Sequence, residues 1–242
     1  MARYDGRAAD QLREVKITPN FTDNPAGSAL CRVGNTMVLC TVCEEDGVPR
    51  WRSGTGLGWV TAEYSMLPGS TDRRGDREAN KGRPSGRTLE IQRLIGRSLR
   101  AVVDMEALGE RSLWVDCDVL QADGGTRCAS ITGAYVALAI ALDKLVARGE
   151  LKARPLRDSV GAVSVGIVDG ELLLDLPYPE DSRADVDMNV VATGAGQLVE
   201  VQATGEGATF APEALTALTG LALQGIQRLE VFQREAIEAA KG

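Results

Sequence analysis

The sequence predicts an α+β fold in which mixed sheets pack against helices. Strand-like runs and long apolar helices alternate in unequal blocks, whereas a doubly wound parallel sheet requires regular alternation. Gly34-Asn35 and Asp169-Gly170 each separate two neighbouring strand-like runs, as hairpin turns do. Strands followed by a helix occur in both halves of the chain, without any sequence repeat.

The first half of the chain is expected to supply the first sheet. Four strands are predicted, at Glu14–Thr18, Ser28–Val33, Thr36–Val42 and Trp59–Tyr64. Leu67–Gly86 reads as a long loop, since it holds proline, glycine and many charges without an apolar period. A helix beginning near Thr88 has one apolar face, and Gly109 fits its C-terminal end.

The centre of the chain predicts a strand and a buried helix. Apolar side chains alternate with polar or aromatic ones from Leu113 to Val119, with Trp114, Asp116 and Asp118 on the second face. A helix is expected from about Arg127 to Arg148. Because this helix is apolar nearly all round, it should lie deep in the core.

The second half is expected to repeat the order of strands and then a helix. After a linker at Lys152–Asp158, strands are predicted at Val160–Val168, Glu171–Leu176, Arg183–Ala192 and Leu198–Gln202. A helix from about Pro212 to Ala240 closes the chain.

Composition excludes several functions. The chain has no histidine, so it cannot form a Ser-His-Asp triad or use histidine-based ribonuclease chemistry. Cys40 and Cys43 form a lone C-x-x-C without further zinc ligands, and we expect small buried thiols rather than a metal or redox site. The longest apolar run, Ala129–Leu142, is too short and too mixed to span a membrane. Because the N-terminus also lacks a signal peptide's apolar segment, we expect a cytoplasmic protein.

Charge is distributed unevenly. The net charge is −7, but residues 71–100 hold nine basic and four acidic groups, so this segment carries +5 and the remainder −12. A local basic stripe in an acidic protein suits a confined RNA or phosphate channel. Charge runs of this kind also occur on solvated helix faces.

The stretch Asp116–Arg127 indicates a phosphate site. A strand ends in two glycines, and a helix begins directly afterwards at Thr126 and Arg127. The first turn of a helix has unpaired N–H groups and a partial positive charge. Glycines allow close backbone approach, and an arginine can grip phosphate with two parallel hydrogen bonds.

Carboxylates suggest a second site. Strand periodicity places Asp185, Asp187 and Asn189 on one face, with Asp181 just upstream. Magnesium commonly binds one or two carboxylates together with substrate phosphate oxygens. A solvent-facing strand edge would give the same pattern. For the other pair, Asp116 and Asp118, we expect a structural role, with both carboxylates bonded to buried backbone or arginine.

These residues resemble the ribonuclease PH family of bacterial phosphate-dependent 3′→5′ exoribonucleases, which trim tRNA 3′ ends. The resemblance rests on ordered stretches that span most of the chain: Gly56–Tyr64, Met66–Pro68, Gly86–Thr88, Glu90–Ile95, Asp116–Arg127, Ala129–Ala134, Glu180–Ser182 and Asp187–Val190. The chain departs from the family pattern at Gly69 and Asp72, where arginine and histidine are usual.

The resemblance implies a single domain over residues 1–242 with a ribosomal-protein-S5-domain-2-like fold, and a homohexamer built as a trimer of dimers. It places phosphate binding on Arg87, Gly125, Thr126 and Arg127, and places catalysis and Mg²⁺ or Mn²⁺ binding on Asp181 and Asp187. Inorganic phosphate is then a co-substrate, and tRNA precursor 3′ ends and other RNA are the partners. For RNA binding we expect Arg73, Arg74, Arg77, Arg93 and Arg97 from the basic segment.

Two other functions remain open at this point. A non-catalytic RNA-binding ring subunit would be expected to lose the phosphate arginines or the aspartates, and this chain keeps both. A hydrolase would use water and release nucleoside monophosphates rather than diphosphates.

Overall fold

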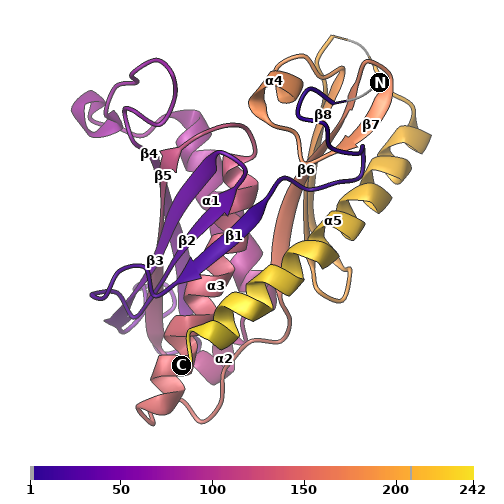
Figure 1. Cartoon of the computed structure of the whole chain (residues 1–242). Helices are drawn as coiled ribbons and strands as arrows, with labels where there is room; N and C mark the ends of the chain where they lie inside the picture. Colours follow the sequence, from indigo (N-terminus) through magenta and orange to yellow (C-terminus); the bar gives the residue numbers. More distant parts are fainter. Residues whose placement is uncertain (1–2, 208) are drawn as a thin grey trace.

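The computed structural model describes residues 3–207 and 209–242. Its named strands form two sheets, and helices lie between and beside these sheets (Figure 1). The predicted α+β architecture is therefore confirmed.

The first sheet has five strands in the order β1-β2-β3-β5-β4. They are β1 (Val15–Pro19), β2 (Gly27–Val33), β3 (Thr36–Asp46), β4 (Trp59–Met66) and β5 (Arg111–Gln121). All neighbours are antiparallel except β4, which runs parallel to β5. Along β5, the predicted apolar face is buried and Trp114 on the other face is 39% exposed. One face of this sheet therefore lies on the core.

The second sheet has four antiparallel strands in the order β7-β6-β8-β9. They are β6 (Val160–Val168), β7 (Glu171–Leu174), β8 (Val186–Thr193) and β9 (Leu198–Gly205). The predicted turn joins β6 to β7, and Asp169 and Gly170 both have positive φ, 52° and 79°. Positive φ at both central residues is what a type I′ hairpin turn requires.

Three long helices complete the core. α3 (Thr126–Ala147) packs against β2 and β3 on one side and β6 on another, and is buried nearly all round as predicted. It is long and apolar enough to cross a membrane, but it is mostly buried here, as a core helix is. α1 (Gly86–Val102) packs beside β4, and α5 (Pro212–Ala239) crosses β1, β6 and α3 (Figure 1). One cluster of buried apolar side chains joins both sheets.

The helix expected to end at Gly109 is in fact two helices. α1 ends at Val102, because Val103 takes an extended conformation. Asp104 then caps the short helix α2 (Met105–Leu108), accepting hydrogen bonds from two of its backbone N–H groups. Gly109 has φ +69° and ends this second helix. An aspartate capping signal therefore lies inside what reads as one continuous pattern.

Two strand boundaries in the second sheet also differ from the prediction. β7 ends at Leu174 rather than Leu176, because Asp175 has φ +56° and turns the chain. β8 begins at Val186 rather than Arg183.

A short helix and a turn precede β8. α4 (Tyr178–Asp181) ends before the expected strand begins, and the turn after it occupies the start of that strand. As a result Asp185, predicted to share a face with Asp187 and Asn189, precedes the strand and is exposed.

The cysteine prediction is half right. Cys40 is buried, but Cys43 is exposed. Positions three apart on a strand point to opposite faces, so the two thiols of this C-x-x-C cannot face each other. The long loop over residues 67–85, hereafter the basic loop, contains one short 3-10 turn, η1 (Glu78–Lys81).

Candidate active site

A two-glycine turn joins the end of β5 to the start of α3. Gly124 and Gly125 have φ of 71° and 65°, left-handed values that glycine adopts without strain. A Cβ on Gly124 would lie 2.7 Å from the carbonyl oxygen of Leu176 and 2.7 Å from the backbone nitrogen of Tyr178. The turn therefore needs glycine, and it packs directly against the chain that enters α4.

Thr126 and Arg127 occupy the first two positions of α3, where unpaired backbone N–H groups and the helix dipole favour an anion. The Thr126 hydroxyl lies 2.9 Å from the phenolic oxygen of Tyr64 on β4. Burial raises the pKa of Tyr64, so the phenol stays neutral and holds this hydroxyl by a hydrogen bond. The sequence places Tyr64 in a predicted strand, but carries no sign of which helix it meets.

The Arg127 guanidinium is held between α1 and β9. Its Nη1 donates to Gln202 Oε1 at 2.7 Å, and Gln202 Nε2 donates to Glu90 Oε1 at 2.9 Å. Glu90 itself lies 3.6 Å from Arg127 and is 40% exposed, so this ion pair is weak. A neutral amide thus orients Arg127 while leaving its charge for an anion. Gln202 was not identified from the sequence.

Arg87 lies in the first turn of α1, two residues after the capping residue Ser85. The positive charges of Arg87 and Arg127 both oppose the rise that burial causes in the pKa of Asp181. Residues from α1, α3 and α4, far apart in the sequence, therefore surround one site.

Asp181 ends α4, and Asp187 lies on β8. Burial raises the pKa of Asp187 to about 6, and the nearby charge of Asp181 adds to the rise. Asp187 Oδ1 is buried and has no hydrogen-bond partner among residues 3–207 and 209–242. A buried carboxylate oxygen left without a partner is costly, so it indicates a ligand that completes it.

The donor set fits a magnesium-type ion. Two carboxylates with one unsatisfied buried oxygen match an ion that takes its remaining ligands from water and substrate phosphate. In the described part of the chain, no three Asp, Glu, Cys or His side chains gather into a metal site. An ion here would therefore depend on Asp181, Asp187 and substrate oxygens.

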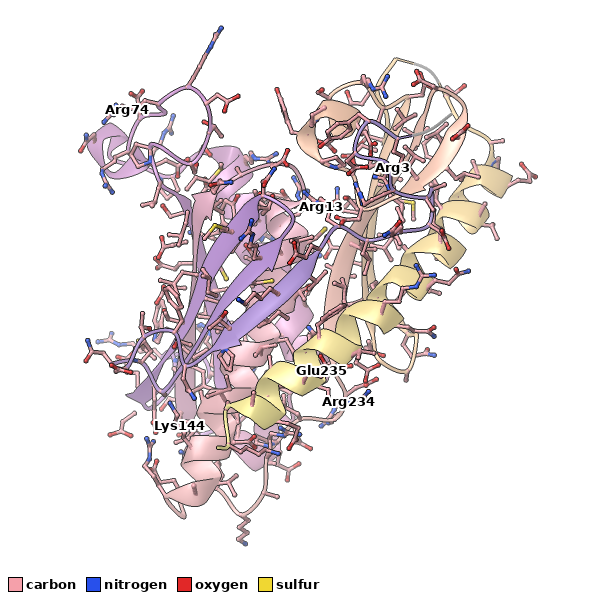
Figure 2. The ribbon with its side chains drawn as sticks, viewed as in Figure 1. Arg3, Arg13, Arg74, Lys144, Arg234 and Glu235 are labelled. Atoms are coloured by element: carbon pink, nitrogen blue, oxygen red, sulfur yellow. The ribbon has the colours of Figure 1, made fainter. Side chains whose placement is uncertain are left out.

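Two buried ion pairs tie the N-terminal segment to this site, and Figure 2 labels their arginines, Arg3 and Arg13. Arg13 donates to both carboxylate oxygens of Asp175, at 2.7 and 3.0 Å, and to the carbonyl of Asp123 at 2.5 Å. Arg3 donates to both carboxylate oxygens of Glu180, at 3.0 and 2.5 Å.

These pairs fix the two ends of the site. All four side chains are at most 6% exposed, so their charges are removed from water. Arg13 holds the residue that opens the glycine turn, and Glu180 directly precedes Asp181. Neither pair was identified from the sequence, where nothing marks Arg3 as the partner of a residue 177 positions away.

The predicted RNA-binding arginines lie outside this cluster. Arg73, Arg74 and Arg77 are exposed on the basic loop, which carries Arg74 away from the body of the molecule (Figure 2). Arg93 and Arg97 are exposed on α1, where Arg97 pairs with a glutamate of β9.

The expected bonding of Asp116 and Asp118 is wrong. Neither carboxylate makes a hydrogen bond or ion pair to any residue that the structure describes. Burial raises the pKa of both, and Glu63 on the neighbouring strand raises that of Asp116 further. Strand alternation places them on the face of the first sheet opposite the buried apolar residues of β5, away from α3.

Comparison with known proteins agrees with this architecture. Family models described as the 3′ exoribonuclease family, domain 1 and domain 2, match residues 11–142 and 158–225. The chain therefore belongs to the 3′ exoribonuclease family.

Two curated relatives are named ribonuclease PH. The protein of Mycobacterium sp. (strain KMS) is 61% identical over 98% of this chain and 92% of its own length. That of Saccharopolyspora erythraea is 60% identical, over 99% and 96%.

Solved structures agree on the fold. The Archaeoglobus fulgidus exosome with RNA bound to the active site matches with a TM-score of 0.80 at 25% identity, over 94% of this chain and 91% of that one. Rice (Oryza sativa) Rrp46 matches in fold with a TM-score of 0.78 at 21% identity, over 97% and 100%. The expected ribosomal-protein-S5-domain-2-like fold is consistent with these neighbours and is confirmed at that level.

Proposed function

We propose that this protein is a phosphate-dependent 3′→5′ exoribonuclease that trims tRNA precursors and releases nucleoside diphosphates. The observation that carries the proposal is that the start of α3, which favours an anion, lies near the buried and incompletely bonded Asp187. Its relatives at 60–61% identity are named ribonuclease PH.

The proposed chemistry uses phosphate as the nucleophile. Arg87, Gly125, Thr126 and Arg127 bind inorganic phosphate through guanidinium groups, a hydroxyl and backbone N–H groups. The phosphate attacks the last phosphodiester in line, and the shortened RNA leaves through its 3′ oxygen. Because the nucleophile is already an anion, a strong base is unnecessary, which suits a chain without histidine. The two arginines offset the repulsion between the two anions.

The carboxylates serve the leaving end of the reaction. Asp181 and Asp187 would hold Mg²⁺ or Mn²⁺, which supplies charge neutralisation at phosphate oxygens when bound. Asp187 acts either as the second ligand or, with its raised pKa, as the acid that protonates the leaving oxygen. Phosphodiester and diphosphate bonds are close in energy, so excess nucleoside diphosphate should extend RNA.

The wider assignments are part of the same proposal. The exposed arginines Arg73, Arg74, Arg77, Arg93 and Arg97 would bind the RNA body. We propose one ribonuclease PH-type domain over residues 1–242, working as a homohexamer in the cytoplasm. Exosome proteins among the structural neighbours support an oligomer, and the burial of α3 in the core supports a protein outside the membrane.

The test is an incubation of a tRNA precursor carrying a few extra 3′ nucleotides, with Mg²⁺, with and without inorganic phosphate. Trimming that requires phosphate and releases nucleoside diphosphates supports the proposal. Trimming without phosphate, releasing monophosphates, would indicate a hydrolase. Binding without trimming would favour a non-catalytic ring subunit.

A further inference from the structure

A second cluster of aromatic and basic side chains lies at the opposite end of β4 from Tyr64. The rings of Trp51 and Trp59 meet edge to face, with centroids 4.8 Å apart and planes at 88°. The Arg52 guanidinium lies 5.6 Å from one ring and 5.2 Å from the other, and that of Arg100 lies 4.6 Å from the Trp59 ring. The proposed chemistry uses none of these residues.

The cluster is held rigidly although its outer member faces solvent. Arg52 Nε donates to the carbonyl of Gly58 at 2.7 Å, and Arg100 Nη1 donates to that of Val60 at 2.9 Å. Backbone hydrogen bonds from residues 52, 53 and 58 fix the rest of the loop. Trp51 is nevertheless 64% exposed. A large ring held in place but left open loses little freedom when a ligand covers it.

The chemistry of the cluster suits a nucleic-acid base. Bases stack on aromatic side chains with little regard to sequence, and arginine adds cation–π contacts and attracts the phosphodiester backbone. Arg52 lies over both rings and Arg100 over the Trp59 ring, and Arg50 directly precedes Trp51 in the chain. Such a surface is complementary to a polyanion that carries flat apolar groups, which describes single-stranded RNA.

The position of the cluster fits an RNA strand that leaves the active site. β4 and α1 connect the active site to this cluster. Tyr64 meets Thr126 near one end of β4, and Trp59 begins the other end. α1 runs alongside, and its 13-residue step from Arg87 to Arg100 spans about 20 Å. That distance corresponds to about six stacked nucleotides at about 3.4 Å each.

Exposed arginines lie on α1 between the two places. Arg93 and Arg97 are exposed on α1 between Arg87 and Arg100. Two carboxylates accompany this stretch: Glu90 of α1, whose side chain is 40% exposed, and Glu200 of β9, which pairs with Arg97 at 2.5 Å.

We propose that Trp51, with Arg52 and Arg100, is a stacking site for a base of the RNA substrate upstream of its 3′ end. This inference rests on the proposed function and adds a contact some six nucleotides from the scissile bond. The site binds an upstream base of a long RNA and does not contact the reacting group.

The test is the Trp51→Ala variant, assayed with single-stranded RNAs of about 4 and about 15 nucleotides at saturating phosphate. Loss of one stacked base, worth about 1–3 kcal/mol, should raise the KM for the long RNA about 5- to 150-fold. The KM for the short RNA, the KM for phosphate and kcat should not change. Trp51→Phe should restore most of the loss. Phe21→Ala is the matched control, since Phe21 is another exposed aromatic residue, at 48%.

Other outcomes would overturn the inference. An unchanged KM for the long RNA, or an equal rise for both lengths, would mean that no upstream base stacks there. A changed sedimentation coefficient for Trp51→Ala would assign the ring to a contact between protein chains. If the wild-type protein releases no nucleoside diphosphates, the proposed function fails by itself. Fluorescence anisotropy of the same two RNAs then decides the stacking site, with weaker binding of the long RNA alone expected for Trp51→Ala.

Discussion

The arginines of this protein fall into two groups that differ in burial and therefore in purpose. Arg3 and Arg13 are buried, each bonded to a buried carboxylate beside the site. Arg73, Arg74 and Arg77 are exposed on the basic loop. A buried charge is tolerated only with a partner, so the first group fixes structure, whereas exposed charges are hydrated and free to meet RNA. The same residue type thus builds the site in one place and is proposed to bind substrate in the other.

The largest effect on activity is expected at the site that the buried arginines support. Asp187→Asn removes a negative charge and an acid without changing size. Turnover should fall about 10²- to 10⁴-fold, the usual contribution of a positioned acid or base, while RNA affinity stays near the wild-type value. Single-turnover kinetics and filter binding measure both. Near-normal turnover would remove Asp187 from the mechanism.

Removing a buried arginine should cost stability. Arg13→Met leaves the carboxylate of Asp175 buried and unpaired, which typically costs about 3–5 kcal/mol. Urea denaturation followed by circular dichroism gives the free energy of unfolding. Arg74→Met is the control and should change it by less than about 0.5 kcal/mol. Equal effects of the two substitutions would abolish the distinction between the groups.

Arg127 belongs to neither group. Its side chain is 17% exposed, yet it is proposed to bind phosphate. Arg127→Ala removes charge-assisted hydrogen bonds worth about 1.5–3 kcal/mol, so the KM for phosphate should rise about 10- to 150-fold. The KM for RNA should change much less. An unchanged phosphate dependence would refute the pocket at the start of α3.

The contribution of the exposed arginines to RNA affinity should depend on salt concentration. Replacing Arg73, Arg74 and Arg77 together by alanine should weaken RNA binding and reduce the slope of log affinity against log salt by up to about 2. Stability and the KM for phosphate should be unaffected. Binding titrations over a range of KCl concentrations test this, and an unchanged slope would mean that the basic loop does not touch phosphates.

The smallest effect concerns pH. Burial raises the pKa of Asp175, but the charge and hydrogen bonds of Arg13 outweigh burial and leave this pKa below its ordinary value. A lowered pKa in the folded state stabilises the protein above the unfolded value, near 3.9, and this contribution is lost as pH falls toward the folded value. The difference in unfolding free energy between wild type and Arg13→Met should therefore shrink below about pH 4. A difference that stays constant to pH 3 would contradict the assignment.

The sequence was sufficient where local patterns decide the structure. Alternation along Leu113–Val119 and the apolar surface of α3 follow from period and burial, and both are confirmed. Local exceptions were missed: Asp104 caps a second helix, and Asp175 turns the chain at a positive φ. Each exception is one polar residue that overrides an apolar pattern.

Long-range pairings could not be predicted in this way. The turn at Gly124–Gly125 indicates an anion site by itself, but nothing in the chain shows that Tyr64 and Gln202 reach its first two helix residues. Likewise, Asp116 and Asp118 were expected to bond buried backbone or arginine, although they lie on the face of β5 that points away from α3. Such contacts depend on how the two sheets are placed, which one sequence does not specify.

The central claim is that inorganic phosphate is the attacking group, and labelled phosphate tests it most directly. The protein is incubated with a tRNA precursor, Mg²⁺ and ³²P-phosphate, and the released nucleotides are separated. Phosphorolysis predicts that the label appears in nucleoside diphosphates, in the phosphate farther from the ribose. Release of unlabelled nucleoside monophosphates would show that water attacks instead, and would contradict the account of Arg87, Thr126 and Arg127.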